Sequence, residues 1–137
     1  MAKITRMSIS IEEDVLRKFN ALIKEEGFPT RSEAIKQLIK SALVQKQWQK
    51  GENIAGVITI IYDHHKSNVL QKIVESQHDF NDLVICSQHA HLDHTNCMEN
   101  IIVQGTVEKI KCLHKRLASV KGIKHTVLSM TTTGGEF

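Results

Sequence analysis

Histidine and cysteine are concentrated in one part of this 137-residue chain, where they could bind a metal. Six of the eight histidines lie between residues 64 and 94. His89 and His91 are two residues apart in a segment that alternates like a β-strand, so their side chains project from one face. The five residues after His91 are enough to turn the chain and bring Cys97 back beside it. Two imidazoles and a thiolate suit Zn, Cu, Ni or Co rather than Mg or Ca, and these ligand types do not choose among the four metals.

Spacing alone gives the other histidines and cysteines no specific role. Three cysteines without a CxxC pair do not indicate a disulfide framework, so we expect reduced thiols. We expect the histidines to be solvated, although those at 64, 65 and 94 could also form weak surface metal sites, and we expect the two cysteines to serve packing. These residues are His64, His65, His94, His114, His125, Cys86 and Cys112.

The first fifty residues predict a short strand followed by two helices. Residues 6–11 alternate polar and apolar side chains, which is typical of a strand with one apolar face. Capping boxes at 10–13 and 30–33 each precede apolar residues at helical spacing, and Gly27 ends the first helix. One strand and two short helices bury too little apolar surface alone, and a single strand leaves its hydrogen-bonding groups unpaired. We therefore expect this part to dimerise through the strand.

The remainder of the chain predicts a second domain. Residues 47–53 are polar except for Trp48 and are expected to be a linker. The periodicity beyond them gives the order β-α-β-β-α-β, a ferredoxin-like arrangement, so the fold class is α+β. That fold hosts many functions and names none. The predicted strands are 54–62, 83–91, 97–104 and 123–130, and the predicted helices are 67–77 and 107–119.

Charge and hydropathy limit the classes of function. Up to residue 50 there are ten Lys and Arg against six Asp and Glu, and beyond it there are eight against nine. A positive N-terminal part suits DNA, although a solvated helical face gives similar counts. No stretch has the ~18 consecutive apolar residues of a membrane span, and the N-terminus does not resemble a signal peptide. We expect a cytoplasmic protein.

Several of these features together resemble one family. They are the ribbon at 6–11, the helix start at 31–35, Ser76-Gln77-His78, Gln88-His89-Ala90-His91 and the following Cys97. The sequence is similar to the NikR family of nickel-responsive regulators across essentially its full length. The resemblance implies a ribbon-helix-helix DNA-binding domain at 1–46, a linker at 47–53, and an ACT-like domain at 54–137 that binds metal and associates into a homotetramer.

The resemblance also supplies a metal and a fourth ligand. In this family nickel lies in a planar site with ligands from two subunits. Carried over, one Ni(II) per subunit is bound by His89, His91 and Cys97, with His78 from a neighbouring subunit. Planar geometry distinguishes Ni(II) or Cu(II) from tetrahedral Zn(II), so the resemblance favours nickel. Glu99, on the same strand face as Cys97, could hydrogen-bond the ligands, or it could be an ordinary solvated carboxylate.

The resemblance implies DNA contacts in the N-terminal domain. Ribbon side chains enter the major groove of a palindromic operator, where an arginine can bond guanine in a bidentate manner. Side chains at the start of the second helix are placed to meet phosphate, although capping alone explains their presence there. The ribbon residues are Arg6, Ser8 and Ser10, and the helix residues are Thr30, Arg31 and Ser32.

The expected function is repression of nickel-uptake genes when nickel is bound. One alternative is a regulator whose ACT-like domain senses a small ligand or another transition metal. A second is a metalloenzyme, which ranks lower because all four proposed positions would be filled by protein ligands. The family's second cation site pairs a Glu with an Asp one helical turn later. Here Glu33 is followed by Gln37, so we do not expect that site.

Overall fold

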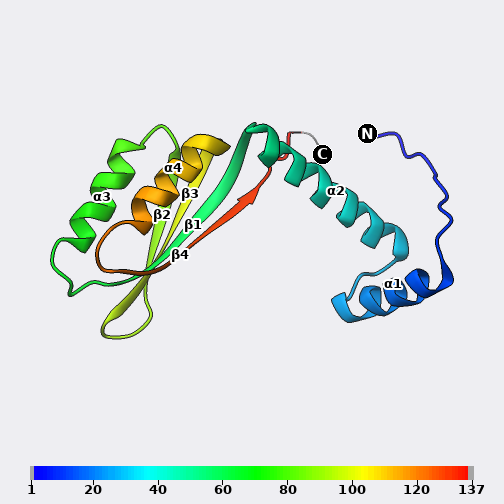
Figure 1. The fold of residues 1–137 in the computed structure, drawn as a ribbon, viewed down its shortest axis with the longest axis horizontal. Helices are drawn as coiled ribbons and strands as arrows, with labels where there is room; N and C mark the ends of the chain where they lie inside the picture. The colour runs from blue at the N-terminus through cyan, green and yellow to red at the C-terminus, as the bar shows by residue number, and fades with distance from the viewer. Residues whose placement is uncertain (1, 136–137) are drawn as a thin grey trace. The chain divides into compact units, whose positions relative to one another are not determined.

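The structure is a computed structural model that describes residues 2–135. It contains two compact units that divide between Ala42 and Leu43. Each unit is described by itself, with the elements labelled as in Figure 1. None of the helices in the described part of the chain is long and apolar enough to cross a membrane.

The first unit contains helix α1 (Glu13–Glu26) and the first turns of α2 (Arg31–Lys50). The capping box predicted at residue 10 is wrong, because the N-cap of α1 is Glu12, which makes no side-chain capping hydrogen bond. Acidic Glu13 and Asp14 instead occupy the first turn, where they favour the positive end of the helix dipole. The second capping prediction is confirmed in its first half: the backbone N–H of Glu33 donates to Oγ1 of Thr30 at 3.1 Å.

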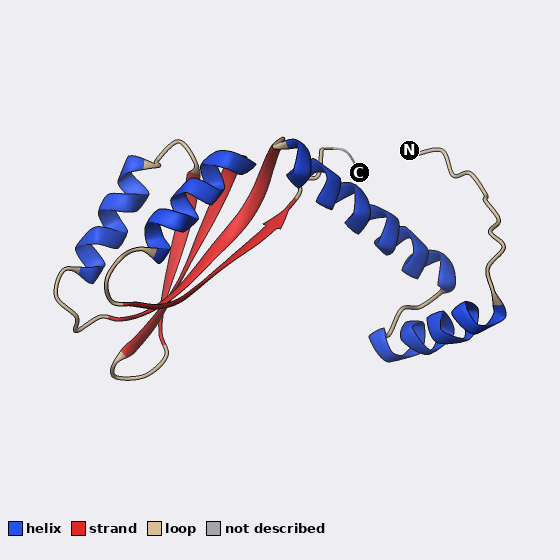
Figure 2. Cartoon of the chain, in the orientation of Figure 1, coloured by secondary structure: helices blue, strands red, loops and turns tan. Residues whose placement is uncertain are grey.

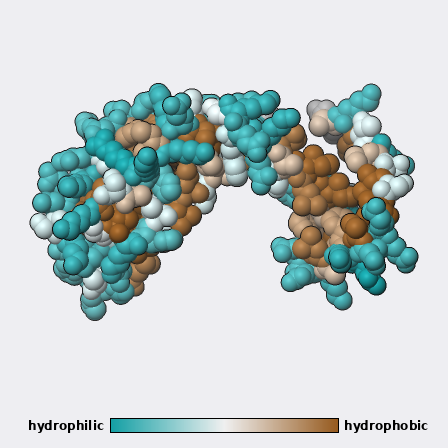
Figure 3. Space-filling view, viewed as in Figure 1, coloured by the Kyte–Doolittle hydropathy of each residue, from teal (hydrophilic) through white to brown (hydrophobic). Residues whose placement is uncertain are grey.

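The predicted strand at 6–11 does not form in the single chain. The described residues before α1 have no strand hydrogen bonds, and all of them are exposed. Met7 is 68% exposed and Ile9 is 55% exposed, and α1 buries none of its residues. Figure 3 shows hydrophobic residues at the surface over this unit. The physical reason is that a ribbon strand needs a second strand for its hydrogen bonds, and one chain offers none.

The second unit confirms the predicted β-α-β-β-α-β order. Its sheet has the strand order β2-β3-β1-β4, with all neighbouring pairs antiparallel, and α3 and α4 lie on one face (Figures 1 and 2). The α+β fold class is therefore confirmed. The elements are β1 (Asn53–Asp63), α3 (Val69–Asp79), β2 (Val84–His91), β3 (Asn96–Thr106), α4 (Val107–Ala118) and β4 (Ile123–Thr131).

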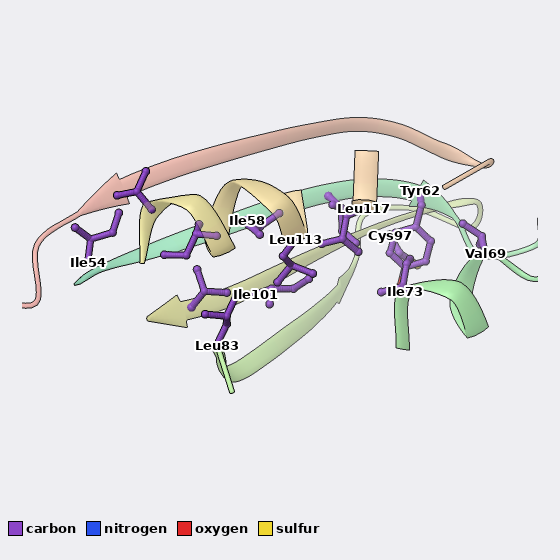
Figure 4. Packing of buried hydrophobic residues seen from close by; sticks show 14 residues of the cluster. Ile54, Ile58, Tyr62, Val69, Ile73, Leu83, Cys97, Ile101, Leu113 and Leu117 are labelled. Atoms are coloured by element: carbon purple, nitrogen blue, oxygen red, sulfur yellow. The ribbon is translucent and has the colours of Figure 1, made fainter. Parts of the chain in front are cut away.

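The core lies between the sheet and the two helices. In β1 the even-numbered residues are buried and the odd-numbered ones after Asn53 are only half-buried, so this apolar strand is covered fully on one face alone. Figure 4 shows Tyr62 and Cys97 together at the end of the core away from Ile54. Pairing of β1 with β3 places Tyr62 opposite Cys97. The buried side chains from β1 and α4 are Ile54, Ile58, Ile60, Tyr62, Val107, Ile110, Leu113 and Leu117.

The segment predicted as a linker begins as the end of a helix. Helix α2 continues to Lys50, because no Gly or Pro interrupts it before Gly51, whose φ of 72° favours glycine. Trp48 packs against the core of the second unit and donates from Nε1 to the carbonyl of Thr131 at 3.3 Å. Residues 47–50 are therefore ordered helix that belongs to the second unit.

Candidate metal centre

The β2–β3 hairpin places the predicted ligands side by side. Its register pairs His91 with Cys97 and His89 with Glu99, as the spacing predicted. The turn between the strands is closed by the backbone N–H of Leu92, which donates to the carbonyl of Asn96 at 2.9 Å. All four paired side chains share one strand face, the face that carries Cys97 into the core.

The turn is held by one carboxylate. Oδ1 of Asp93 accepts hydrogen bonds from the backbone N–H groups of Thr95 and Asn96 at 2.8 and 2.7 Å. The Asn96 side chain also donates to the same carboxylate. These hydrogen bonds lower the pKa of Asp93 to about 2. The carboxylate stays ionised at neutral pH and fixes the hairpin that carries the ligands.

A thiol-centred cluster forms at this end of the sheet. Sγ of Cys97 lies 3.3 Å from Nδ1 of His91 and 3.3 Å from Nδ1 of His64. One ligand atom from each of these three residues lies within 4.8 Å of the others. The ring of His89 is next to that of His91, with centroids 4.9 Å apart. Soft sulfur and imidazole nitrogen donors converging on one point fit a late first-row transition metal.

His64 is the residue that sequence reasoning missed. We expected a solvated side chain or at most a weak surface metal site, but it is half-buried and contacts the Cys97 thiol. The reason is non-local: β1 pairs with β3 and ends opposite the start of that strand, with Tyr62 facing Cys97. Two residues later the chain passes the thiol, and the backbone N–H of His64 donates to the carbonyl of Thr95. The only signal in the sequence was a histidine just past an apolar strand.

His89 is connected to a chain of polar groups that includes the buried Tyr62 and Glu99. Its Nδ1 lies 3.0 Å from the Tyr62 hydroxyl, which donates to Oε2 of Glu99 at 3.5 Å. Oε1 of Glu99 accepts from Nε2 of Gln77 at 2.9 Å. A tyrosine that donates to Glu99 can accept from Nδ1–H of His89, which leaves Nε2 free to bind metal. Glu99 is buried and supports this network, so the solvated alternative for it is wrong.

The electrostatics of the cluster favour a bound cation. Burial raises the pKa of the Cys97 thiol, and the carboxylates of Asp93, Asp63 and Glu99 raise it further. The thiol is therefore protonated in the metal-free protein at neutral pH, and a metal must displace this proton. The same carboxylates attract a positive ion. Burial and then Glu99 also raise the pKa of Tyr62, which keeps its hydroxyl available as a donor.

His78 is not part of the ligand cluster that the described residues of its own chain form. It occupies the last turn of α3, and its exposed side chain makes no hydrogen bond or ion pair with the residues that the structure describes. Its neighbour Gln77 points to Glu99, so the end of α3 is close to the network behind the ligands. The predicted role of His78 in a neighbouring subunit stays a prediction.

The residues predicted to contact DNA all lie in the first unit and are exposed. Besides the Thr30 cap, the structure gives one of them a partner: Nε of Arg31 donates to Oδ1 of Asn20 at 2.9 Å. Their contacts with DNA stay predictions. The six residues are Arg6, Ser8, Ser10, Thr30, Arg31 and Ser32.

Two known protein families match parts of this chain, and together they define its class of protein. Residues 5–46 match the ribbon-helix-helix proteins of the copG family, and residues 55–131 match the NikR C-terminal nickel-binding domain. A ribbon-helix-helix unit joined to such a domain defines a metal-responsive transcriptional regulator, and this class excludes the metalloenzyme alternative.

Relatives match over nearly the whole chain. A candidate nickel-responsive regulator of Nitratidesulfovibrio vulgaris strain Miyazaki F is 46% identical over 135 residues, which cover 98% of this chain and 97% of that protein. Another from Thermococcus onnurineus is 43% identical over 135 residues, covering 98% of each. The chain belongs to the NikR family of nickel-responsive regulators.

A solved structure is similar in fold alone. An uncharacterized protein from Thermotoga maritima aligns with a TM-score of 0.50 and 12% identity, covering 60% of this chain and 99% of that one. At this identity the likeness concerns the fold and carries no function.

Proposed function

We propose that this protein binds one Ni(II) per subunit through His89, His91 and Cys97, with His78 of a neighbouring subunit as the fourth ligand. The observation that carries the proposal is the Cys97 thiol, which is buried at the end of the core with an imidazole nitrogen of His91 at 3.3 Å. The exposed side chain of His78, which has no hydrogen bond or ion pair among the described residues, is available to a second subunit. Two imidazoles, a thiolate and a third imidazole in a plane suit Ni(II).

His64 provides an alternative ligand for metals of other geometry. It shares the Cys97 thiol with His91 within one chain, so a tetrahedral ion could use this trio without a neighbouring subunit. Nickel specificity then depends on the fourth, intersubunit ligand. The small-ligand alternative has weaker support, because the convergent polar groups of this domain are metal donors.

The N-terminal units would bind the operator as ribbon-helix-helix dimers. A ribbon formed by two copies of residues 6–11 would enter the major groove, with Arg6 bonding guanine and the hydroxyls of Ser8 and Ser10 contacting other bases. Thr30, Arg31 and Ser32 at the start of α2 would contact phosphate by a helix N-terminus.

Nickel would act as a co-repressor in the cytoplasm. Two ribbon-helix-helix dimers would be joined by a homotetramer of the C-terminal domains, and metal binding between subunits would favour arrangements in which both dimers reach a palindromic operator. Repression of nickel-uptake genes at high nickel is the simplest output of such a sensor.

The proposal is tested by measuring operator affinity with and without metal. A duplex selected from a random library by the nickel-loaded protein serves as operator. Adding Ni(II) to chelator-treated protein is expected to raise affinity about 5- to 150-fold, the usual range of allosteric coupling, while Mg(II) is the control and has no such effect. Equal affinity before and after nickel addition would contradict the proposal.

Tyr62→Phe is expected to weaken nickel binding about tenfold, the lower end of the effect of removing a partner behind a metal ligand. The phenyl ring keeps the buried packing, but His89 loses the hydroxyl at 3.0 Å that orients its ring. Competition with a chelator of known affinity measures the change.

Thr106→Ala is the matched control for Tyr62→Phe. It also removes one hydroxyl hydrogen bond, the cap to the N–H of Lys109, but it lies at the opposite end of β3 from Cys97. It should lower stability by about 1 kcal/mol and leave nickel affinity unchanged. Equal nickel affinity in the Tyr62 variant and the wild type would show that the network does not act on the ligands.

A further inference from the structure

The segment around His78 is held by a clamp from α4. Nη2 of Arg116 donates to Oδ2 of Asp79 at 2.5 Å, and its guanidinium carbon lies 5.8 Å from the centroid of the Phe80 ring. The two residues that follow His78 in the chain are therefore both engaged by one side chain. A planar guanidinium can pair with a carboxylate and stack on an aromatic ring at the same time, which an ammonium cannot do equally well.

The helix that carries Arg116 is fixed against the core. Arg116 lies in the last turn of α4, between Leu113 and Leu117, which are fully buried against the sheet. Figure 1 shows α3 and α4 side by side on the same face of the sheet. Phe80 is itself half-buried against the core, so the guanidinium contacts a fixed ring. The core therefore fixes the position of Arg116, and the contacts of Arg116 with Asp79 and Phe80 fix the end of α3.

We propose that Arg116 is a positioning residue for nickel binding: it fixes the last turn of α3 so that His78 is presented to the site of a neighbouring subunit. This inference rests on the proposed role of His78 as the fourth ligand. The side chain of His78 has no hydrogen bond or ion pair of its own among the described residues, so its position depends on the helix end that carries it. A planar site needs its ligand in a narrow range of positions, and a helix end that frays before binding must be ordered during it.

Loss of the Arg116 contacts should change nickel affinity much more than the stability of the fold. The side chains of Arg116 and Asp79 are 41% and 52% exposed, and exposed ion pairs contribute little to folding. A second ion pair from the same helix offers a matched comparison: Nζ of Lys109 lies 3.3 Å from Oδ2 of Asp82, beyond the end of α3. Its side chains are more exposed, at 60% and 61%, and it does not engage the residues next to His78.

The test compares Arg116→Met with Lys109→Met in the full-length protein, each with and without His78→Ala. Nickel affinity is measured by chelator competition, and the visible absorption of planar Ni(II) reports the geometry. We expect Arg116→Met to weaken binding about tenfold and reduce the planar spectrum, with an unchanged unfolding midpoint, while Lys109→Met stays within about twofold of wild type. In the His78→Ala background, Arg116→Met should have no further effect.

The outcomes separate this inference from the proposed function. If His78→Ala weakens binding and Arg116→Met does not, the positioning role is wrong and the fourth ligand stands. If Arg116→Met causes the same loss with and without His78, it acts by another route, and the inference is overturned. If His78→Ala leaves nickel affinity unchanged, both the fourth ligand and the positioning role are wrong.

Discussion

Replacing Cys97 with alanine is expected to weaken Ni(II) binding by more than about 100-fold, beyond the usual effect of losing an outer partner. The thiol is the shared contact of His64 and His91 and the one sulfur donor of the cluster. Without it, a soft site becomes a set of imidazoles, which binds late transition metals less tightly. The nickel dependence of operator binding should disappear with it.

Chelator competition measures the loss of nickel affinity, and operator binding in the presence of nickel measures the loss of the nickel response. Cys112→Ala is the matched control, because that thiol is exposed on α4 and lies outside the candidate metal groups of the described chain. Circular dichroism checks the fold, since removing a buried sulfur costs only about 1 kcal/mol. Wild-type nickel affinity in the Cys97 variant would exclude this thiol as a ligand and contradict the sensor proposal.

The part of the metal centre that local pattern could predict is the part made by one hairpin. His89, His91 and Cys97 lie within nine residues, and strand alternation with a short turn is enough to place them on one face. His64 depends on β1 being the neighbour of β3 in the sheet, which is a pairing across more than thirty residues. Local periodicity carries no information about strand order, so this contact was missed.

Local patterns also predicted most of the fold, with two errors. The six elements of the second unit follow from local hydrophobic periodicity, and their order is as predicted. The linker prediction overlooked that Gln and Lys favour helix as well as loops, so α2 continues until Gly51. The capping box at Ser10 matched a common motif, but Glu12 occupies the cap, and the motif does not say which residue the helix begins after.

The ribbon is the element whose structure we expect to depend on a second copy of the chain. Between residues 3–9 and α2 the first unit has an open cavity of about 710 Å³, lined in part by the apolar side chains of Ile4, Met7, Ile9 and Ile39. A single chain leaves these side chains exposed. Pairing of two ribbons would satisfy the strand hydrogen bonds and cover the apolar face together, as the sequence pattern predicts.

Ile9→Asp is therefore expected to abolish DNA binding while leaving nickel binding in the C-terminal domain. Burying one isoleucine is worth about 1.5–3 kcal/mol, and two-fold symmetry applies the loss twice. The aspartate adds the cost of burying a charge without a partner. A loss of about 3–6 kcal/mol corresponds to roughly 100-fold or more in association, by 1.4 kcal/mol per tenfold.

Ser8→Asp is the control that separates dimerisation from DNA contact. It has the opposite parity in the ribbon, so its carboxylate should face DNA and repel phosphate while the apolar face stays intact. Both variants should lose operator affinity, but only Ile9→Asp should lower the helicity and unfolding midpoint of the N-terminal unit. A destabilising Ser8→Asp beside a harmless Ile9→Asp would mean that the ribbon faces the other way, and the DNA contacts of Arg6, Ser8 and Ser10 would have to be abandoned with it.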